Sequence, residues 1–426
     1  MRTEDRQLMQ SITVLPVQKN DRIQLLDILR GFAILGIFIM NLEGFTFYWS
    51  LNDAQKAQLP LAQYSDAAEF LMNMFLEGKF YSIFSMLFGI GFAIYLSKAE
   101  ENKTILPLFR RRLLILLLIG FLHLLLWSGD IVMFYAMLGF VLIPFRKFSN
   151  KTLLIIAGLC ILSPIAWYAI KMSNPRVFNL ARYLYQAGER DSVQFGITSN
   201  ETAYKELSGG DFIRLIRMNL SGIFFRYGDL LFQSRAFKVL GMFLTGLVIG
   251  RTKFYHRLQQ NKRLLWQIFL GGLLIGLPAN YIYATLKETR GYGELTMHGW
   301  KQTVAYAFGV VPLALAYASG MALLYLNKIA QRFLNLLAPV GKMALTNYIM
   351  HTFVGIFLFT KLGIFHAPIG PAHWTILALG VFVIQIFTSA VWLRFFNYGP
   401  LEWLWRSATY RKWQLMIRQR SYKPAD

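Results

Sequence analysis

The chain has 426 residues, of which 55% are hydrophobic and 15% are charged, against roughly a quarter charged in ordinary soluble domains. Water is therefore not its main solvent. The net charge of +22 does not indicate a nucleic-acid-binding protein, because basic cytoplasmic loops account for such a balance in a membrane protein. The single cysteine, Cys160, excludes a disulfide framework and a thiolate cluster, and no bound metal is expected.

Apolar runs recur along nearly the whole chain. A bilayer core of roughly 30 Å requires about 20 apolar residues per crossing, in helices that satisfy their own backbone groups. The expected fold class is all-α, a polytopic integral membrane helix bundle of about ten transmembrane helices. The expected spans are residues 24–46, 67–97, 113–127, 130–145, 152–170, 236–250, 264–285, 302–326, 339–361 and 374–396.

Basic residues alternate between the connecting loops and predict the orientation, because short cytoplasmic loops carry an excess of Lys and Arg. We expect the basic set of loops, which includes Lys151, Arg257 and Lys328, to face the cytoplasm together with both termini. The predicted organisation is a cytoplasmic N-terminal segment (1–22), an N-terminal transmembrane half (23–170), an extracytoplasmic or interfacial segment (171–235), a C-terminal transmembrane half (236–396) and a basic cytoplasmic tail (397–426).

Two segments depart from a simple pattern of spans. Residues 212–232 have helical periodicity interrupted by arginines such as Arg226, and they could span the membrane, re-enter it or lie at its surface. Residues 64–97 are long for one span and contain Glu77, Gly78 and Lys79, which suit a helix that turns before entering the membrane. No internal repeat of the kind found in inverted-repeat transporters is evident.

Ionisable and polar side chains within the spans are the candidate functional residues, because burying them in a membrane is costly. Asp27, Arg30 and Asn41 lie along one side of the first predicted helix, and Arg30 and Asn41 point within about 20° of each other. Asp27 and Arg30 are candidates for substrate binding. The alternative is that Asp27 only neutralises Arg30 near the cytoplasmic surface.

His123 and Asp130 are separated by a short turn, so we expect them to lie within about 6 Å of each other in the outer layer of the membrane. A carboxylate beside an imidazole orients the ring and makes it a stronger base, which suits general-base catalysis on a hydroxyl or amine. A contact that only packs helices together is the alternative. We expect His123, Asp130, Asn41, Asp27 and Arg30 to face one interior cavity.

The remaining candidates are divided between substrate binding and acyl-donor binding. Glu77, Lys79, Asn347 and His351 are candidates for substrate binding, or for contacts between helices. Arg110, Arg111, Arg112 and Lys342 could bind the phosphates of cytoplasmic coenzyme A, or serve only to keep their loops inside.

Five stretches of the sequence resemble the YeiB-like bacterial membrane proteins, whose C-terminal part is known as domain of unknown function 418. They are LLDILRGFAILGIFIMN (25–41), GKFYSIFSMLFGIGF (78–92), RRLLILLLIGFLHLLLWSGDIVMFYAMLGF (111–140), GKMALTNYIMH (341–351) and GPLEWLWR (399–406). The resemblance covers both halves of the chain in order. It implies a multi-pass protein of the bacterial cytoplasmic (inner) membrane.

The N-terminal half is also distantly similar to transmembrane acyltransferases that include heparan-α-glucosaminide N-acetyltransferase. This similarity implies that Asn41 is a functional asparagine and that acetyl-CoA, or another acyl-CoA, is the donor. The catalytic histidine of that family falls at Asn52 here, and we infer that His123 replaces it.

Three functions remain open from the sequence. One is acyl transfer from cytoplasmic acyl-CoA to an envelope glycan, lipid or small molecule, with His123 as base, Asp130 orienting it and Asn41 steadying the acceptor or the oxyanion. The second is transport of a small solute along the same buried polar residues. The third is a non-catalytic scaffold. The bilayer is the expected partner in each case, and a homodimer is possible.

Overall fold

The computed structural model describes residues 23–97, 105–209, 211–288, 295–360 and 368–418. Within these ranges the secondary structure is helical, and the only extended pairing is one isolated antiparallel bridge. The bridge pairs Phe396 with Ile417. The predicted all-α fold class is confirmed.

The helices follow the predicted hydrophobic runs. In chain order they are α2 (Gln24–Phe45), α3 (Asp53–Ala57), α4 (Ser65–Phe75), α5 (Lys79–Ser97), α6 (Ile105–Leu126), α7 (Val132–Leu142), α8 (Asn150–Ser173), α9 (Pro175–Phe178), α10 (Ala181–Gln194), α11 (Asn200–Ser208), α12 (Phe212–Phe232), α13 (Arg235–Arg251), α14 (Lys262–Glu288), α15 (Met297–Tyr325), α16 (Lys328–Leu334), α17 (Ala338–Lys342), α18 (Ala344–Phe359), α19 (Pro371–Phe395) and α20 (Pro400–Tyr410).

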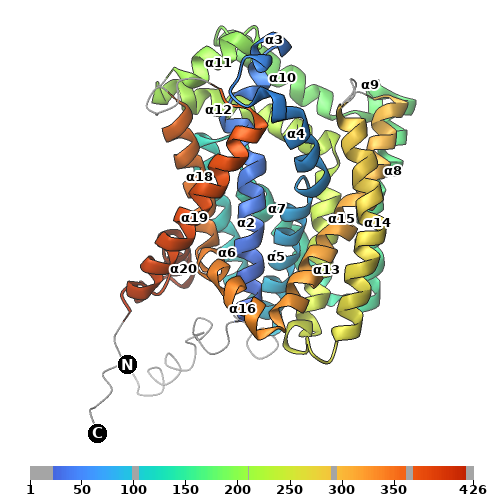
Figure 1. Ribbon diagram of the computed structural model, residues 1–426, viewed down its shortest axis with the longest axis vertical. Helices are drawn as coiled ribbons and strands as arrows, with labels where there is room; N and C mark the ends of the chain where they lie inside the picture. Colours follow the sequence, from blue (N-terminus) through green and yellow to red (C-terminus); the bar gives the residue numbers. More distant parts are fainter. Residues whose placement is uncertain (1–22, 98–104, 210, 289–294, 361–367, 419–426) are drawn as a thin grey trace, which may run out of the picture.

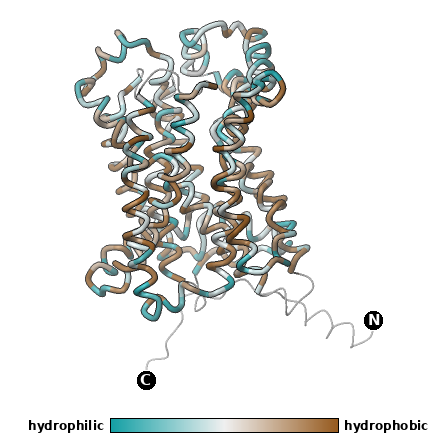
Figure 2. The backbone as a smooth tube through the Cα atoms, turned by 90° about the vertical axis from the view of Figure 1, so that its right-hand side faces the viewer, coloured by the Kyte–Doolittle hydropathy of each residue, from teal (hydrophilic) through white to brown (hydrophobic). Residues whose placement is uncertain are grey.

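Within the described ranges, six helical segments are long and apolar enough to cross a membrane. They are Gln24–Ser50, Ala62–Ser97, Asn150–Ser173, Lys262–Lys287, Met297–Tyr325 and Pro371–Phe395. A seventh is counted if α12 and α13, which meet at a bend of 67°, form one broken span. This is fewer than the expected ten, because α6 contains the three consecutive arginines Arg110 to Arg112, α7 is only 11 residues long and α18 is only 16. Hydrophobic residues predominate along the helices in Figure 2.

The bundle has two chemically different ends (Figure 1). The short helices α3, α10 and α11 gather at one end, which we call the cap end. The loop between α13 and α14 lies at the opposite end together with α16, and we call it the basic end because both segments carry Lys and Arg. These two basic segments, which the sequence assigns to the same side of the membrane, thus lie at one end of the bundle.

The helices α5 and α13 are in backbone contact between the two ends. A Cβ atom added to Gly89 would lie 2.0 Å from the carbonyl oxygen of Phe243, and one added to Gly246 would lie 2.0 Å from that of Met86. Small residues permit such close packing between membrane helices. The bundle is therefore tightly packed where α5 and α13 meet.

The chain between α4 and α5 turns where the sequence predicted a turn. Gly78 has a φ of +84°, which residues with a side chain rarely adopt. A Cβ atom there would also lie 2.4 Å from the hydroxyl oxygen of Tyr306. Glycine therefore permits this break, which directs the side chains on either side of it into the interior of the bundle.

Candidate functional site

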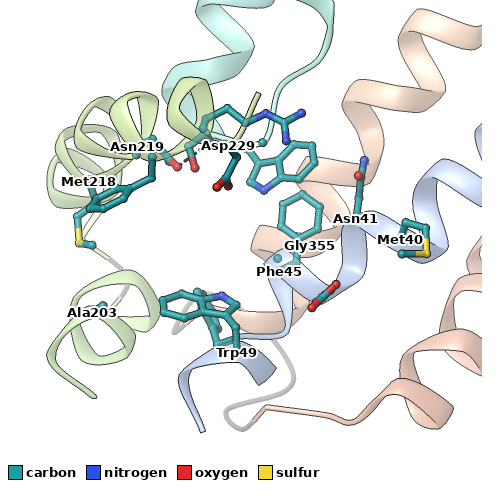
Figure 3. A pocket seen from close by; sticks show the side chains of 18 of the residues that line it. Met40, Asn41, Phe45, Trp49, Ala203, Met218, Asn219, Asp229 and Gly355 are labelled. Atoms are coloured by element: carbon teal, nitrogen blue, oxygen red, sulfur yellow. Dashed lines mark hydrogen bonds between the residues drawn. The ribbon is translucent and has the colours of Figure 1, made fainter. Parts of the chain in front are cut away.

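A large cavity of about 1090 Å³ lies at the cap end of the bundle. Its walls come from the end of α2, the α4–α5 turn, the α6–α7 turn, α10 to α12, the start of α13, the end of α14 and α18. Figure 3 shows Met218 and Asn219 of α12 across the cavity from Asn41 and Phe45 of α2. Ligand pockets commonly measure roughly 300–1,000 Å³, so this one has room for a sugar-sized or larger molecule.

Aromatic and charged side chains line the cavity together. The aromatic residues are Phe45, Phe47, Trp49, Phe80, Tyr81, Trp127, Phe225 and Tyr348. The ionisable carboxyl groups are those of Glu43, Glu77, Glu189 and Asp229, and the cations are Arg226, Arg235 and Lys287. Apolar walls with a few converging polar groups are typical of sites that bind organic molecules.

Two of these charged groups are available to a ligand. The side chains of Glu43 and Arg226 have no hydrogen-bond or ion-pair partner within the described part of the chain. Both line the cavity, Glu43 from the last turn of α2 and Arg226 from the middle of α12. A carboxyl group and a guanidinium on opposite helices can bind complementary groups of one molecule.

The α4–α5 turn carries a buried charge network beside the cavity. Glu77 accepts a hydrogen bond from Lys287 at 2.6 Å, and the same ammonium group donates to Asn73 Oδ1 at 2.7 Å. The ammonium of Lys79, which is fully buried, donates to the backbone carbonyl of Asn73 at 2.8 Å. Glu77 lines the cavity, whereas Lys79 lies behind its wall. This network connects α14 to the turn.

His123 and Asp130 form the contact that the sequence predicted. The Nδ1 atom of His123 lies 2.7 Å from Asp130 Oδ1, and Asp130 Oδ2 accepts the backbone N–H of Met133 at 2.7 Å. The Nε2 atom of His123 lies 2.8 Å from the hydroxyl oxygen of Thr352 on α18. All three side chains are at most 3% exposed. An ionised Asp130 only accepts hydrogen bonds, so Nδ1 carries a proton and Nε2 of a neutral ring accepts from Thr352.

This Asp130–His123–Thr352 relay lies directly behind the cavity wall. The ring centroid of His123 lies 6.0 Å from that of Trp127 and 5.3 Å from that of Tyr348. Both of these aromatic residues line the cavity. On the cavity side, Trp127 is in contact with Phe45 at 4.6 Å. The relay is thus separated from the cavity by a single layer of aromatic side chains.

The structure does not bring the five residues expected in one cavity together, and that expectation is wrong. Asn41 alone among them lines the cavity. Asp27 forms an ion pair with Arg30 at 2.7 Å, near the start of α2. About 21 Å of helix separates Asp27 from Asn41, at 1.5 Å per residue. This geometry favours the alternative in which Asp27 neutralises Arg30 near the basic end.

Asn347 and His351 face α19 instead of the cavity. Asn347 donates to Ser389 Oγ at 3.0 Å, and His351 Nε2 lies 3.1 Å from Gln385 Oε1. The ring of His351 also stacks on Phe38 at 3.9 Å. These contacts favour a role in joining α18 to its neighbouring helices.

The basic residues proposed to bind coenzyme A lie outside the wall of this cavity. Arg112 stacks on Trp405 at 3.8 Å and donates to the hydroxyl of Tyr95 at 3.3 Å, so it packs α6 against α20. Arg110 is exposed, and Arg111 and Lys342 are partly exposed. All three side chains therefore reach the surface of the protein.

Sequence reasoning missed Thr352, Glu43 and the lack of a partner for Arg226. Thr352 follows His351 directly, but a threonine in an apolar helix carries no signal of its own. Glu43 could have been found, because it is an acidic residue in the last turn of the first span, two residues after Asn41.

Comparisons with known proteins identify relatives along almost the whole chain. Residues 249–412 match the model of a family described as "Protein of unknown function (DUF418)". The uncharacterized protein YxaH of Bacillus subtilis (strain 168) is 31% identical over 413 residues, which cover 95% of this chain and 98% of that protein. An uncharacterized 39.9 kDa protein from the amylase 3′ region of Bacillus acidopullulyticus is 30% identical, and the match covers 95% of this chain and 99% of that protein. The uncharacterized protein YeiB of Escherichia coli (strain K12) is 27% identical, and the match covers 91% of this chain and 96% of that protein. No solved structure matches the chain.

Proposed function

This chain belongs to the DUF418 family, and from that premise we propose that it is a membrane-embedded acyltransferase of the bacterial cytoplasmic membrane. It moves an acyl group, such as acetyl, from cytoplasmic acyl-CoA to an acceptor in the cap-end cavity. The acceptor is an envelope glycan, a lipid headgroup or a small molecule that carries a hydroxyl or amine.

The observation that carries this proposal is the Asp130–His123–Thr352 relay. A carboxylate, an imidazole and a hydroxyl in this order, at 2.7 and 2.8 Å, match the arrangement that activates hydroxyl groups in acyl-transfer enzymes. His123 acts as the base and Asp130 orients its ring. Asn41 lines the cavity nearby and steadies the acceptor or the oxyanion.

The reaction balances with the residues of the relay. The acceptor oxygen or nitrogen bonds to the acyl carbonyl carbon, and the carbon–sulfur bond of the thioester breaks. Thr352 passes its hydroxyl proton to Nε2 of His123 as its oxygen takes the proton of the acceptor, and the proton returns to the departing thiolate by the same route. For this to occur, the layer formed by Trp127, Phe45 and Tyr348 has to open toward the cavity. At the basic end, Arg110, Arg111 and Lys342 bind the phosphates of the donor.

Transport of a small solute is the second candidate. It is favoured by the broken α4–α5 and α12–α13 helices, because interrupted helices form substrate sites in many transporters. The backbone contacts between α5 and α13 at Gly89 and Gly246 close the bundle at that crossing, so a solute path between these two helices would have to separate them. Acyl transfer needs only one opening on each side.

The direct test uses inside-out vesicles containing the purified protein, because they expose its cytoplasmic face. Radiolabelled acetyl-CoA is added outside, with an extract of envelope glycans and lipids enclosed in the lumen. We expect label to accumulate in the lumenal extract together with release of free thiol outside. Labelling equal to that of protein-free vesicles would overturn the proposal, and solute flux that does not require acetyl-CoA would favour transport.

We further propose about ten membrane crossings, with both termini in the cytoplasm, in a protein able to form a homodimer. Reporter domains inserted at Lys151 and Arg257 should then report the cytoplasm. A reporter at Asn52, in the cap-end loop after α2, should report the outside. A cytoplasmic signal at Asn52 would contradict this topology and the extracytoplasmic position of the cavity.

A further inference from the structure

A second, smaller cavity of about 250 Å³ lies beside the bend between α12 and α13. Residues of α8, α10, α14 and α15 complete its wall, and Asp229 lines both this cavity and the larger one. Its volume is below the roughly 300–1,000 Å³ typical of sites for drug-sized ligands. The cavity therefore suits a compact group rather than a glycan.

Lys238 of α13 contributes a buried cation to this cavity. The residue is 7% exposed, and its ammonium nitrogen lies 3.9 Å from the centre of the Tyr306 ring. Within the described ranges it has no hydrogen-bond or ion-pair partner. The ring face attracts the cation but does not replace the hydrogen bonds that an ammonium group makes in water. The side chain thus has unused donors directed at a cavity.

Positive charge predominates around Lys238. Arg235 and Lys171 repel it, and the attraction that opposes them comes from Glu77, whose carboxylate is already paired with Lys287. Lys171 is itself 2% exposed and donates to the backbone carbonyl of Phe232, which lines the cavity. An excess of buried positive charge is costly in a membrane protein unless an anion accompanies it.

A carboxylate and several neutral groups complete the wall. Asp229 accepts a hydrogen bond from the hydroxyl of Tyr185 at 2.8 Å, which stabilises its charge at the edge shared with the larger cavity. Ser234 precedes α13 with a positive φ of 53° and is 4% exposed. Ser234 lines the cavity four residues before Lys238, and a serine hydroxyl can donate a hydrogen bond to a ligand. Gln302 of α15 also lines the cavity.

We propose that the smaller cavity is an anion site that binds a phosphoryl group through Lys238, with Ser234 as an additional hydrogen-bond donor. Asp229 offsets one of the three cations Lys171, Arg235 and Lys238. A phosphoryl dianion offsets the other two, and its compact shape suits the volume. The group can belong to free inorganic phosphate or to the headgroup of an anionic lipid. The site stands apart from the acyl-transfer relay, and no step of that reaction depends on it.

The test measures thermal unfolding of the purified protein in a zwitterionic detergent. Inorganic phosphate is titrated in one arm, and in another phosphatidic acid is compared with phosphatidylcholine in mixed micelles. Binding to the folded state raises Tm in a concentration-dependent manner. We expect one of the two phosphoryl sources to raise Tm, and Lys238→Met to weaken that response by about tenfold or more in apparent affinity.

Two further variants keep the test decisive. Ser234→Gly removes one hydroxyl, and glycine suits the left-handed backbone at that position, so this variant should fold and bind several-fold more weakly. Lys205→Met, at an exposed position of α11, removes the same charge elsewhere and should respond like the wild type. The proposal is overturned if neither phosphate nor phosphatidic acid raises Tm. An equal response in wild type and both cavity variants would also overturn it.

Discussion

Replacing His123 with asparagine is expected to reduce acyl transfer by about 10² to 10⁴, the usual contribution of a general base. The amide can donate to Asp130 in place of Nδ1, but it does not reach Thr352 and cannot accept a proton near neutral pH. Expression should therefore be retained, and stability should fall by about 0.6 kcal/mol for the lost bond to Thr352. The measurement is the rate of label transfer in vesicles, normalised to the amount of folded protein.

His351→Asn is the matched control for this experiment. His351 is also a buried histidine, but it bonds to Gln385 instead of a carboxylate and lies outside the relay. Its replacement should affect stability by about 0.6 kcal/mol, the average for a hydrogen bond between membrane helices, and leave the rate per folded molecule unchanged. Full activity of His123→Asn would rule out the imidazole as base. Transport would then be the better-supported function.

Replacing Glu77 with alanine should lower the free energy of unfolding by about 3 kcal/mol, toward the lower end of the range for breaking a buried ion pair. The substitution leaves the ammonium of Lys287 without its 2.6 Å partner at a position that is 18% exposed. The remaining bond from Lys287 to Asn73 does not neutralise the charge. Unfolding by denaturant in detergent micelles measures the change.

The double variant Glu77→Gln with Lys287→Met separates the loss of a pair from the loss of a side chain. Removing both charges should restore much of the stability, because neither member of the pair is then left without the other. Glu201→Ala breaks an exposed pair with Lys205 and should change stability by no more than about 0.5 kcal/mol. If Glu77→Ala is no more destabilising than Glu201→Ala, the network at the α4–α5 turn does not stabilise the bundle.

Several features of this protein could be predicted from residues that lie close together in the sequence. Hydrophobic runs predicted the helices, and their polar and basic connections predicted which loops share one end of the bundle. The contact between His123 and Asp130 was predictable because a turn of few residues forces the two helix ends together. Gly78 likewise marked the break between α4 and α5. Each of these features depends on residues close in sequence.

The larger cavity and the third member of the relay depended on tertiary structure alone. Thr352 is 229 residues from His123, and Lys287 is 210 from Glu77, so no periodicity or spacing could pair them. Asp27 and Asn41 lie on one helix, yet the length of that helix places them at different ends of the bundle. A polar stripe on one helix specifies a direction around its axis, whereas a site needs side chains from several helices at the same depth. Only the packing of α6, α7 and α18 against α2 decides which polar residues meet that condition.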